Sequence, residues 1–176
     1  MILKLKRTPG IYLTGFMASG KSTIGRTLAD RIGWHFIDLD EDIETAEKMT
    51  IAQIFETRGE PEFRRIEREM MRARVYSIEC GRPAVMALGG GAIVAPENYA
   101  MVENNGVVIW LDCPFEIVKR RMEGTSHRPL AHDPERLAQL YETRRESYAR
   151  ADYRIVVEGD DPAVAVEAVL RLPLFK

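Results

Sequence analysis

The clearest chemical signal in the sequence is the segment Gly15-Phe-Met-Ala-Ser-Gly-Lys-Ser22, which matches the phosphate-loop pattern G-x-x-x-x-G-K-[ST] at every position. Glycines at these positions let consecutive backbone N–H groups turn inward around a phosphate. Lys21 can then reach the β- and γ-phosphates of ATP, and the Ser22 hydroxyl can bind Mg²⁺. The motif therefore predicts an ATP site formed by Ala18, Ser19, Gly20, Lys21, Ser22 and Thr23.

The segments on either side of this loop support a phosphate site. Residues 11–14 form a short apolar run typical of a buried strand, and residues 21–32 carry apolar side chains at helical spacing. A strand followed by a helix is the context in which a helix N-terminus binds phosphate. The alternative is a glycine turn with an incidental lysine, which would not explain why the loop lies between a strand and a helix.

Two carboxylates, Asp38 and Asp40, stand at the end of a second expected strand, residues 34–39. Alternation along a strand would place both on one side, toward the phosphate loop. Asp38 could hold Mg²⁺ through water, and Asp40 could accept the proton of an attacking hydroxyl. The alternative is that Asp40 caps a helix over residues 41–46.

Two further segments suggest a site for an acidic substrate. Arg64 and Glu67 are three residues apart on an expected helix, and the Arg64 guanidinium could bind a carboxylate through two hydrogen bonds. The alternative is a solvated ion pair. Gly89, Gly90 and Gly91 follow a buried strand, where backbone without side chains can approach a ligand closely.

The stretch from 123 to 134 has no apolar period and predicts a mobile lid loop. Arg128 within it could stabilise charge on a transferring phosphoryl group. An exposed turn is the alternative. The strand over residues 107–111 ends at Asp112, a weaker candidate for the metal because Pro114 just beyond favours a helix-capping role.

Composition limits the partners. The chain has 25 basic and 27 acidic residues and a net charge of −2, so nothing favours nucleic acid or an anionic membrane. No apolar run approaches the roughly 20 residues that span a bilayer. Cys80 and Cys113 match no metal or redox spacing, which predicts reduced thiols. We expect a cytoplasmic protein.

The elements that must position these residues alternate between strand and helix. Continuous apolar strands predict a parallel sheet covered on both faces, an α/β fold. Strands are expected over residues 11–14, 34–39, 84–88, 107–111 and 154–157. Helices are expected over residues 21–32 and 41–46, from residues 50, 61 and 114 onward, and over 134–149 and 162–172.

The ordered segments together resemble the shikimate kinase family of P-loop kinases, from about residue 10 to residue 170. The phosphate loop at residues 15–23 and Phe36-Ile-Asp-Leu-Asp40 resemble the family's loop and acidic pair. Residues 54–67 resemble its substrate helix, and Leu88-Gly-Gly-Gly-Ala92 resembles its glycine turn. Arg128-Pro-Leu130 resembles its lid, and Arg144-x-x-x-Tyr148 resembles the helix after the lid.

The resemblance implies a three-layer sandwich with a five-stranded parallel sheet in the order 2-3-1-4-5. It implies one P-loop kinase domain over residues 1–176, with a substrate segment at about 38–67 and a lid at about 123–134. The implied reaction transfers the γ-phosphoryl group of ATP to the 3-hydroxyl of shikimate, with Mg²⁺, in aromatic amino-acid biosynthesis. A monomer is expected.

Individual roles follow from the same resemblance. Shikimate would be bound by Asp40, Arg64, Gly89, Gly90, Gly91 and Arg144, with both arginines on its carboxylate. Lys21, Asp40 and Arg128 would be catalytic, Arg121 and Arg128 would contact the nucleotide, and Ser22 and Asp38 would serve the metal.

Two positions depart from the family pattern. Ala18 stands where glycine is frequent, and Ala131 stands where a second leucine is frequent. Neither position carries a reacting group, so they concern the packing of the lid. The rival functions are a related kinase for gluconate or a nucleotide, and a nucleotide-binding ATPase module without small-molecule chemistry.

Overall fold

A computed structural model describes residues 10–123 and 133–175 of the chain. Within these residues five parallel strands form one sheet in the order β2-β3-β1-β4-β5, which confirms the expected order. All five residues of β1 are buried, as expected for a central strand covered on both faces. The strands are β1 Gly10–Thr14, β2 His35–Asp38, β3 Ala84–Ala87, β4 Gly106–Asp112 and β5 Tyr153–Val156.

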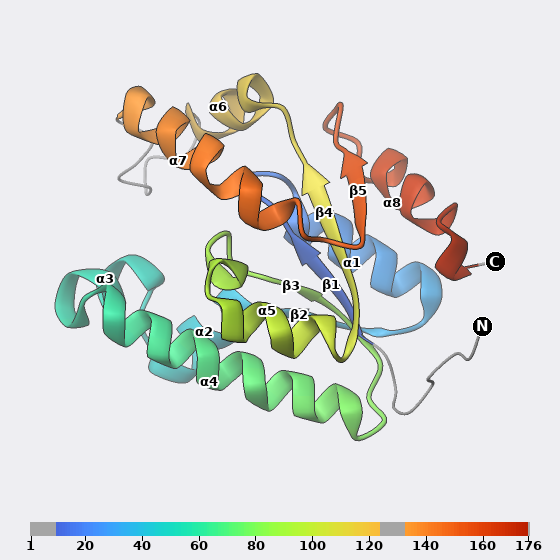
Figure 1. The fold of residues 1–176 in the computed structure, drawn as a ribbon, viewed down its shortest axis with the longest axis horizontal. Helices are drawn as coiled ribbons and strands as arrows, with labels where there is room; N and C mark the ends of the chain where they lie inside the picture. Colours follow the sequence, from blue (N-terminus) through green and yellow to red (C-terminus); the bar gives the residue numbers. More distant parts are fainter. Residues whose placement is uncertain (1–9, 124–132, 176) are drawn as a thin grey trace.

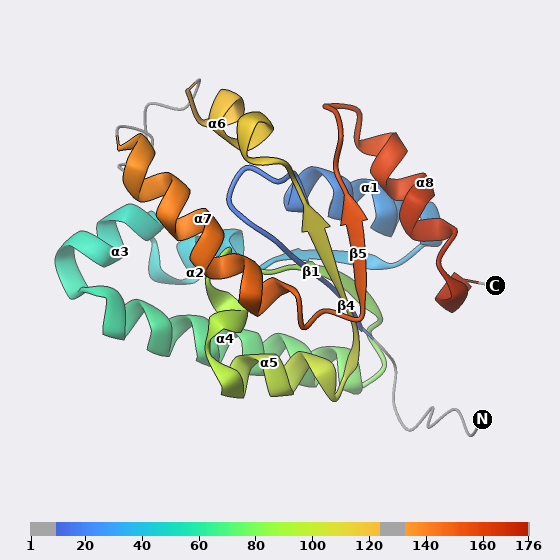
Figure 2. The ribbon, with the colours of Figure 1, turned by 45° about the horizontal axis from the view of Figure 1, so that its top comes forward.

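Helices cover both faces of the sheet, so the fold is the expected three-layer α/β sandwich (Figures 1 and 2). Helices α1 and α8 pack together on one face, and α4, α5 and α7 lie on the other. The helices are α1 Lys21–Ile32, α2 Leu39–Glu47, α3 Ile51–Arg58, α4 Glu60–Glu79, α5 Pro96–Glu103, α6 Phe115–Glu123, α7 Pro134–Tyr148 and α8 Pro162–Leu170, with short 3₁₀ helices η1 Ala92–Val94 and η3 Pro173–Phe175.

The structure corrects two of the sequence-based expectations about local elements. Strand β2 ends at Asp38, and Asp40 lies in the first turn of α2. Asp38, not Asp40, caps that helix, because its carboxylate accepts hydrogen bonds from the backbone N–H groups of Asp40 and Glu41. Helix α5 was not expected, since its apolar side chains have no clear helical spacing.

The sheet topology decides where functional residues can meet. In a parallel sheet the carboxyl ends of all strands lie at one edge, where α/β proteins bind their ligands. Here the phosphate loop follows β1, Asp38 ends β2, the three glycines follow β3 and Asp112 ends β4. The start of β1 and helix η3 lie on the opposite side of the molecule (Figures 1 and 2).

Among the described residues, no helix has both the length and the apolar character needed to cross a bilayer.

Candidate active site

The phosphate loop adopts the backbone that its sequence predicts. Gly15 and Gly20 have φ angles of 146° and 93°, values that glycine tolerates and other residues rarely adopt. Ala18 also has a positive φ, of 60°, at the position where the family often has glycine. The Lys21 ammonium donates hydrogen bonds to the carbonyl oxygens of Gly15 (2.9 Å) and Phe16 (2.8 Å), which holds its charge over the loop.

The loop also contains a buried hydroxyl. The Ser19 side chain is fully buried, and its oxygen has no hydrogen-bond partner among the described residues. Its backbone N–H donates to the carbonyl of Phe16 at 3.2 Å and so closes the loop. A buried polar atom without a partner is uncommon in proteins and is found most often at functional sites.

Ser22 and Asp38 meet directly at the mouth of the loop. The Ser22 hydroxyl donates a hydrogen bond to the Asp38 carboxylate, whose second oxygen caps helix α2. Mg²⁺ prefers oxygen ligands and usually binds one or two protein groups besides phosphates and water. The pair therefore fits this ion. No group of three His, Cys, Asp or Glu side chains suited to a metal occurs in the described part of the chain.

Asp40 has a strongly perturbed acidity. Burial is the largest effect and raises the pKa of Asp40 to about 6. The Lys21 ammonium acts in the opposite direction, whereas the carboxylates of Asp38, Glu67 and Glu44 raise the pKa further. A carboxylate with a pKa near the working pH is suited to accept a proton from a hydroxyl group.

The glycine turn after β3 lies against the charged side chains. A methyl group on Gly89 would stand 2.8 Å from Asp40 Oδ1 and 3.1 Å from Glu67 Oε2. A methyl group on Gly91 would stand 2.6 Å from Arg64 Nη2. The absence of side chains is thus a requirement of the site, because only bare backbone leaves room for these groups.

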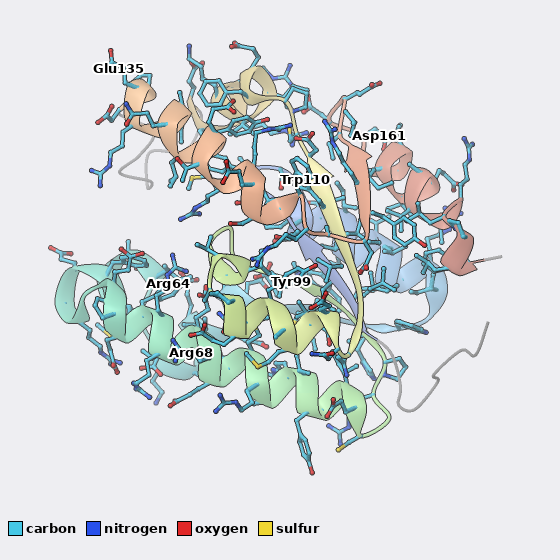
Figure 3. All side chains as sticks on the ribbon, viewed as in Figure 1. Arg64, Arg68, Tyr99, Trp110, Glu135 and Asp161 are labelled. Carbon is cyan, nitrogen blue, oxygen red and sulfur yellow. The ribbon has the colours of Figure 1, made fainter. Side chains whose placement is uncertain are left out.

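Two arginines from different helices converge at Gly91. The first is Arg64 of α4, which is labelled in Figure 3. The second is Arg144 of α7, whose Nη2 atom would lie 3.1 Å from a methyl group on Gly91. Arg144 Nη1 is also near Gly90, whose flank is formed by the phosphate-loop backbone at Met17 and Gly15. The structure therefore brings both predicted arginines to the edge of the phosphate loop.

Glu67 orients the first of these arginines. Its side chain is 1% exposed, and Oε1 accepts a hydrogen bond of 2.8 Å from Arg64 Nη1. Its Oε2 is buried and has no hydrogen-bond partner in the described part of the chain. Burial raises the pKa of Glu67, while Arg64 and Arg144 lower it. The sequence indicated the Arg64–Glu67 spacing but did not show that Glu67 faces Gly89.

Tyr148 connects α7 to the glycine turn and was missed as a site residue, although it belongs to the Arg144-x-x-x-Tyr148 pattern. Its hydroxyl donates a 2.5 Å hydrogen bond to the carbonyl of Gly90. Burial raises the pKa of Tyr148 to about 12, so the hydroxyl stays protonated at neutral pH and remains a donor. The bond fixes the turn against the helix that carries Arg144.

Arg121 closes the other side of the phosphate loop. Its Nη1 donates to the Ala18 carbonyl at 2.9 Å, and its Nη2 donates to the Gly159 carbonyl at 2.8 Å. It lines a cavity of about 400 Å³ next to the loop, together with Ala18, Gly20, Thr23, Ile24, Val157, Gly159, Asp160, Asp161 and Pro162. This cavity lies directly beside the phosphate loop.

Asp112 is not available as a metal ligand. It is buried, and its two oxygens accept hydrogen bonds from Arg145 at 2.7 and 3.3 Å and from Arg154 at 2.8 Å. A carboxylate held by two guanidinium groups has little capacity left for a cation. The acid that faces Ser22 comes from β2 instead.

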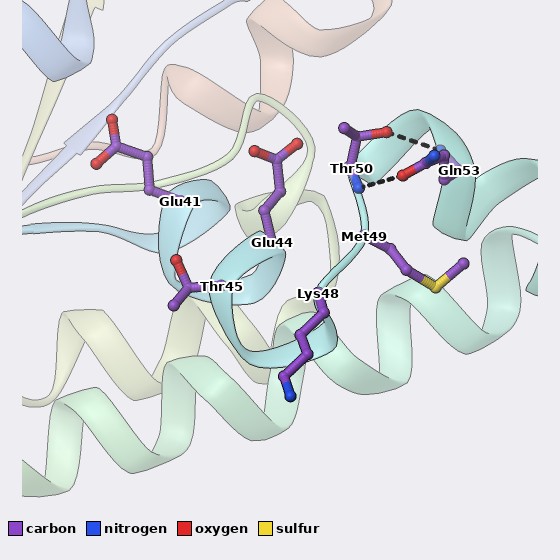
Figure 4. Close-up of a pocket in the computed structure, with 7 residues that line it drawn as sticks. All are labelled: Glu41, Glu44, Thr45, Lys48, Met49, Thr50 and Gln53. Carbon is purple, nitrogen blue, oxygen red and sulfur yellow. Dashed lines mark hydrogen bonds between the residues drawn. The ribbon is translucent and has the colours of Figure 1, made fainter.

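A second hollow, of about 490 Å³, lies between α2 and α3 (Figure 4). It is more open than the cavity beside Arg121 and contains none of the individual residues predicted for the site. Its Thr50 and Gln53 form a capping box that begins α3, and Glu44 accepts from the backbone N–H of Ile51. Thr50, Gln53 and Glu44 are therefore explained by their role in beginning α3. Its lining is Glu41, Glu44, Thr45, Lys48, Met49, Thr50 and Gln53.

Arg128 and Ala131, and most of the expected lid, lie outside the described residues. Every other predicted site residue lies around the carboxyl edge of the sheet.

Comparison with known proteins points to one family. The family model described as shikimate kinase matches residues 17–172. A shikimate kinase of Persephonella marina is 41% identical over 161 residues, which cover 91% of this chain and 96% of that protein. A chloroplastic shikimate kinase of Solanum lycopersicum is 40% identical over 85% of this chain and 52% of its own length.

Solved structures agree with the sequence relatives. A shikimate kinase from Acinetobacter baumannii in complex with shikimate matches with a TM-score of 0.86 and 35% identity, covering 94% of this chain and 93% of that one. A shikimate kinase from Aquifex aeolicus gives a TM-score of 0.80 at 34% identity, covering 92% and 94%. An APS kinase from Mycobacterium tuberculosis shares the fold alone, with a TM-score of 0.57 at 13% identity over 93% and 96%.

Proposed function

This chain belongs to the shikimate kinase family, and we propose that it transfers the γ-phosphoryl group of ATP to the 3-hydroxyl of shikimate, giving ADP and 3-phosphoshikimate. The observation that carries the proposal is the meeting of Arg64 and Arg144 at Gly91, beside Asp40 and the phosphate loop. It joins a site for a carboxylate, an acid suited to accept a proton and a site for phosphates within one edge of the sheet.

The two arginines bind the carboxylate of shikimate. A guanidinium group can donate two parallel hydrogen bonds to a carboxylate, which fixes the orientation of the ring as well as its position. Glu67 already holds one nitrogen of Arg64, so that side chain is preorganised before the substrate arrives. The bare backbone of the glycine turn then lets the ring lie against β3.

Asp40 acts on the hydroxyl group that reacts. As the hydroxyl oxygen attacks the γ-phosphorus, its proton moves to the Asp40 carboxylate, and the bond between the γ-phosphorus and the β–γ bridging oxygen breaks. The electron pair of that bond leaves with ADP. A pKa of about 6 makes Asp40 ionised at neutral pH yet basic enough to assist the transfer.

The phosphate loop supplies the charge stabilisation. Lys21 leaves the carbonyl oxygens of Gly15 and Phe16 and contacts the β- and γ-phosphates of ATP. The N–H groups of the loop donate hydrogen bonds to oxygens of the same phosphates. Mg²⁺ bound by Ser22 and, through water, by Asp38 would neutralise charge on these phosphates. Arg121 would contact the base, and Arg128, outside the described residues, is assigned to the transferring phosphoryl group by the family resemblance alone.

We also propose that the enzyme acts in the cytoplasm as a monomer. Both of its cysteines, exposed Cys80 and buried Cys113, are free thiols, which agrees with a reducing compartment. Sedimentation analysis of the purified chain tests the oligomeric state, and a stable dimer at micromolar concentration would contradict it.

The function is tested by measuring ADP release with ATP and Mg²⁺ against a panel of acceptors: shikimate, quinate, gluconate and nucleoside monophosphates. We expect turnover with shikimate to exceed that with every other acceptor. Gluconate also carries a carboxylate, so it tests whether the arginine pair alone determines specificity. Faster turnover with gluconate or a nucleotide would overturn the proposal.

A further inference from the structure

A cluster of charged and aromatic side chains lies behind the substrate arginines, at the end of β4. Its centre is Asp112, which is 4% exposed. Arg145 of α7 donates to both carboxylate oxygens, at 2.7 and 3.3 Å, and Arg154 of β5 forms an ion pair of 2.5 Å with Oδ2. The proposed reaction uses none of these three groups.

Trp110 completes the cluster. It stands two residues before Asp112 on the same strand, and therefore on the same face of the sheet, beneath α7 (Figure 3). The guanidinium carbons of Arg145 and Arg154 lie 4.9 and 5.0 Å from the centre of its rings. Each arginine is thus held by a carboxylate and by the face of an aromatic ring, an arrangement suited to a planar cation.

Arg145 is the direct neighbour of Arg144 on α7, and successive helical side chains point about 100° apart. Arg144 can therefore face Gly91 only while Arg145 faces Asp112. Two other bonds tie the same helix to the sheet edge: Tyr141 donates to the Cys113 carbonyl at 2.9 Å, and Tyr148 donates to the Gly90 carbonyl at 2.5 Å. A rotation of α7 that released Arg145 would carry Arg144 away from the glycine turn.

We propose that Arg145 is a positioning residue for shikimate binding: its contacts with Asp112 and Trp110 fix the rotation of α7 and so place Arg144 against the carboxylate of the substrate. The inference rests on the proposed function, because it assigns the substrate carboxylate to Arg144. It predicts a larger effect on the acid substrate than on ATP, since Arg144 faces the glycine turn, whereas α7 meets the phosphate loop through the edge contact of Tyr141 with Phe16.

The cluster supplies its own control. Arg154 pairs with the same carboxylate and stacks on the same ring, but it belongs to β5 and not to the helix that carries Arg144. Removing either arginine leaves Asp112 with one cationic partner. Arg145 additionally donates to the Tyr141 hydroxyl of its own helix at 3.0 Å, so its loss acts more directly on α7. The difference between them reports the position of α7 rather than general stability.

The test compares Arg145→Gln with Arg154→Gln by steady-state kinetics, calorimetric titration with shikimate and thermal unfolding. We expect both variants to melt at lower temperature than the wild type. Arg145→Gln should raise KM and the dissociation constant for shikimate by about 10- to 100-fold, in the range known for misplaced positioning groups. Its KM for ATP should change by much less than its KM for shikimate, and Arg154→Gln should keep the wild-type KM for shikimate.

Arg145→Lys serves if the glutamine variant does not fold. Lysine keeps the charge but cannot donate from two nitrogens or stack as a plane, so we expect an intermediate rise in KM for shikimate. Equal effects of the Arg145 and Arg154 variants on shikimate binding would overturn the inference, as would a wild-type KM in Arg145→Lys. A wild-type protein that neither binds nor phosphorylates shikimate would overturn the proposed function as well.

Discussion

Replacing Gly91 by alanine is a direct probe of the arginine pair. Gly91 has φ −112° and ψ 0°, a backbone conformation open to alanine, so the substitution should not strain the main chain. The added methyl group would stand 2.6 and 3.0 Å from the two terminal nitrogens of Arg64 and 3.1 Å from Arg144 Nη2. The first effect of Gly91→Ala is therefore a displacement of Arg64 and Arg144, the proposed ligands of the substrate carboxylate.

The size of this displacement follows from the contact distances. Arg64 Nη2 must move by about 0.8 Å to reach 3.4 Å, where ordinary contacts begin. Arginine ends are flexible, so the fold can accommodate the shift. A misplacement of about 1 Å in a positioning group can cost about 100-fold in rate. We expect kcat/KM for shikimate to fall by about 30- to 100-fold, which corresponds to about 2–3 kcal/mol.

The assay is steady-state ADP release with each substrate varied in turn. Gly91→Ala should raise KM for shikimate and leave KM for ATP and the unfolding temperature close to wild-type values. The unchanged ATP constant serves as the internal control, because the nucleotide site has no contact with the new methyl group. If shikimate kinetics stayed at the wild-type level, Arg64 and Arg144 would not be the carboxylate ligands.

The remaining predictions concern the other charged groups of the site. Lys21→Met should abolish turnover without lowering the unfolding temperature, since Lys21 bonds to loop carbonyls and not to the core; normal turnover would refute the phosphate-loop assignment. With a pKa of about 6 for Asp40, kcat/KM for shikimate should fall tenfold per pH unit below about pH 6. The folded protein binds this proton more tightly than the unfolded chain does, so ionisation of Asp40 should lower the free energy of unfolding as the pH rises from about 4 through 6. Asp40→Asn should therefore be more stable than the wild type at pH 8. Urea titrations that gave both proteins the same dependence of stability on pH would argue against the raised pKa. Arg64→Ala should weaken shikimate binding by roughly 2–5 kcal/mol, about 30- to several-thousand-fold, with ATP affinity retained; calorimetry showing the reverse pattern would reassign Arg64.

Much of this fold could be predicted because its strands are continuous apolar runs and its loops carry unusual residues. The β1 strand, the phosphate loop and α1 are each specified by residues adjacent in sequence, and their bounds were predicted closely. Helix α5 was missed for the opposite reason. Its buried positions include Asn98, so its pattern of apolar residues does not match its buried face.

The site could be predicted as a set of residues but not as a set of contacts. The reason given for placing Asp38 and Asp40 together was wrong, since the chain leaves the strand at Asp38 and turns into α2. Glu67 was noted in the sequence only for its spacing from Arg64, and Arg145 was not singled out. Their importance comes from partners 22 and 33 positions away, Gly89 and Asp112, and no local pattern encodes such distances.

The start of β1 and helix η3 lie on the side of the molecule opposite the phosphate loop, so both are far from the active site. This arrangement has a practical consequence for immobilising the protein or fusing it to another domain. A linker, fused domain or sensor surface attached at either of these segments would leave from the side of the molecule opposite the Arg121 cavity and the arginine pair. Tethered molecules should therefore bind ATP and shikimate as freely as molecules in solution.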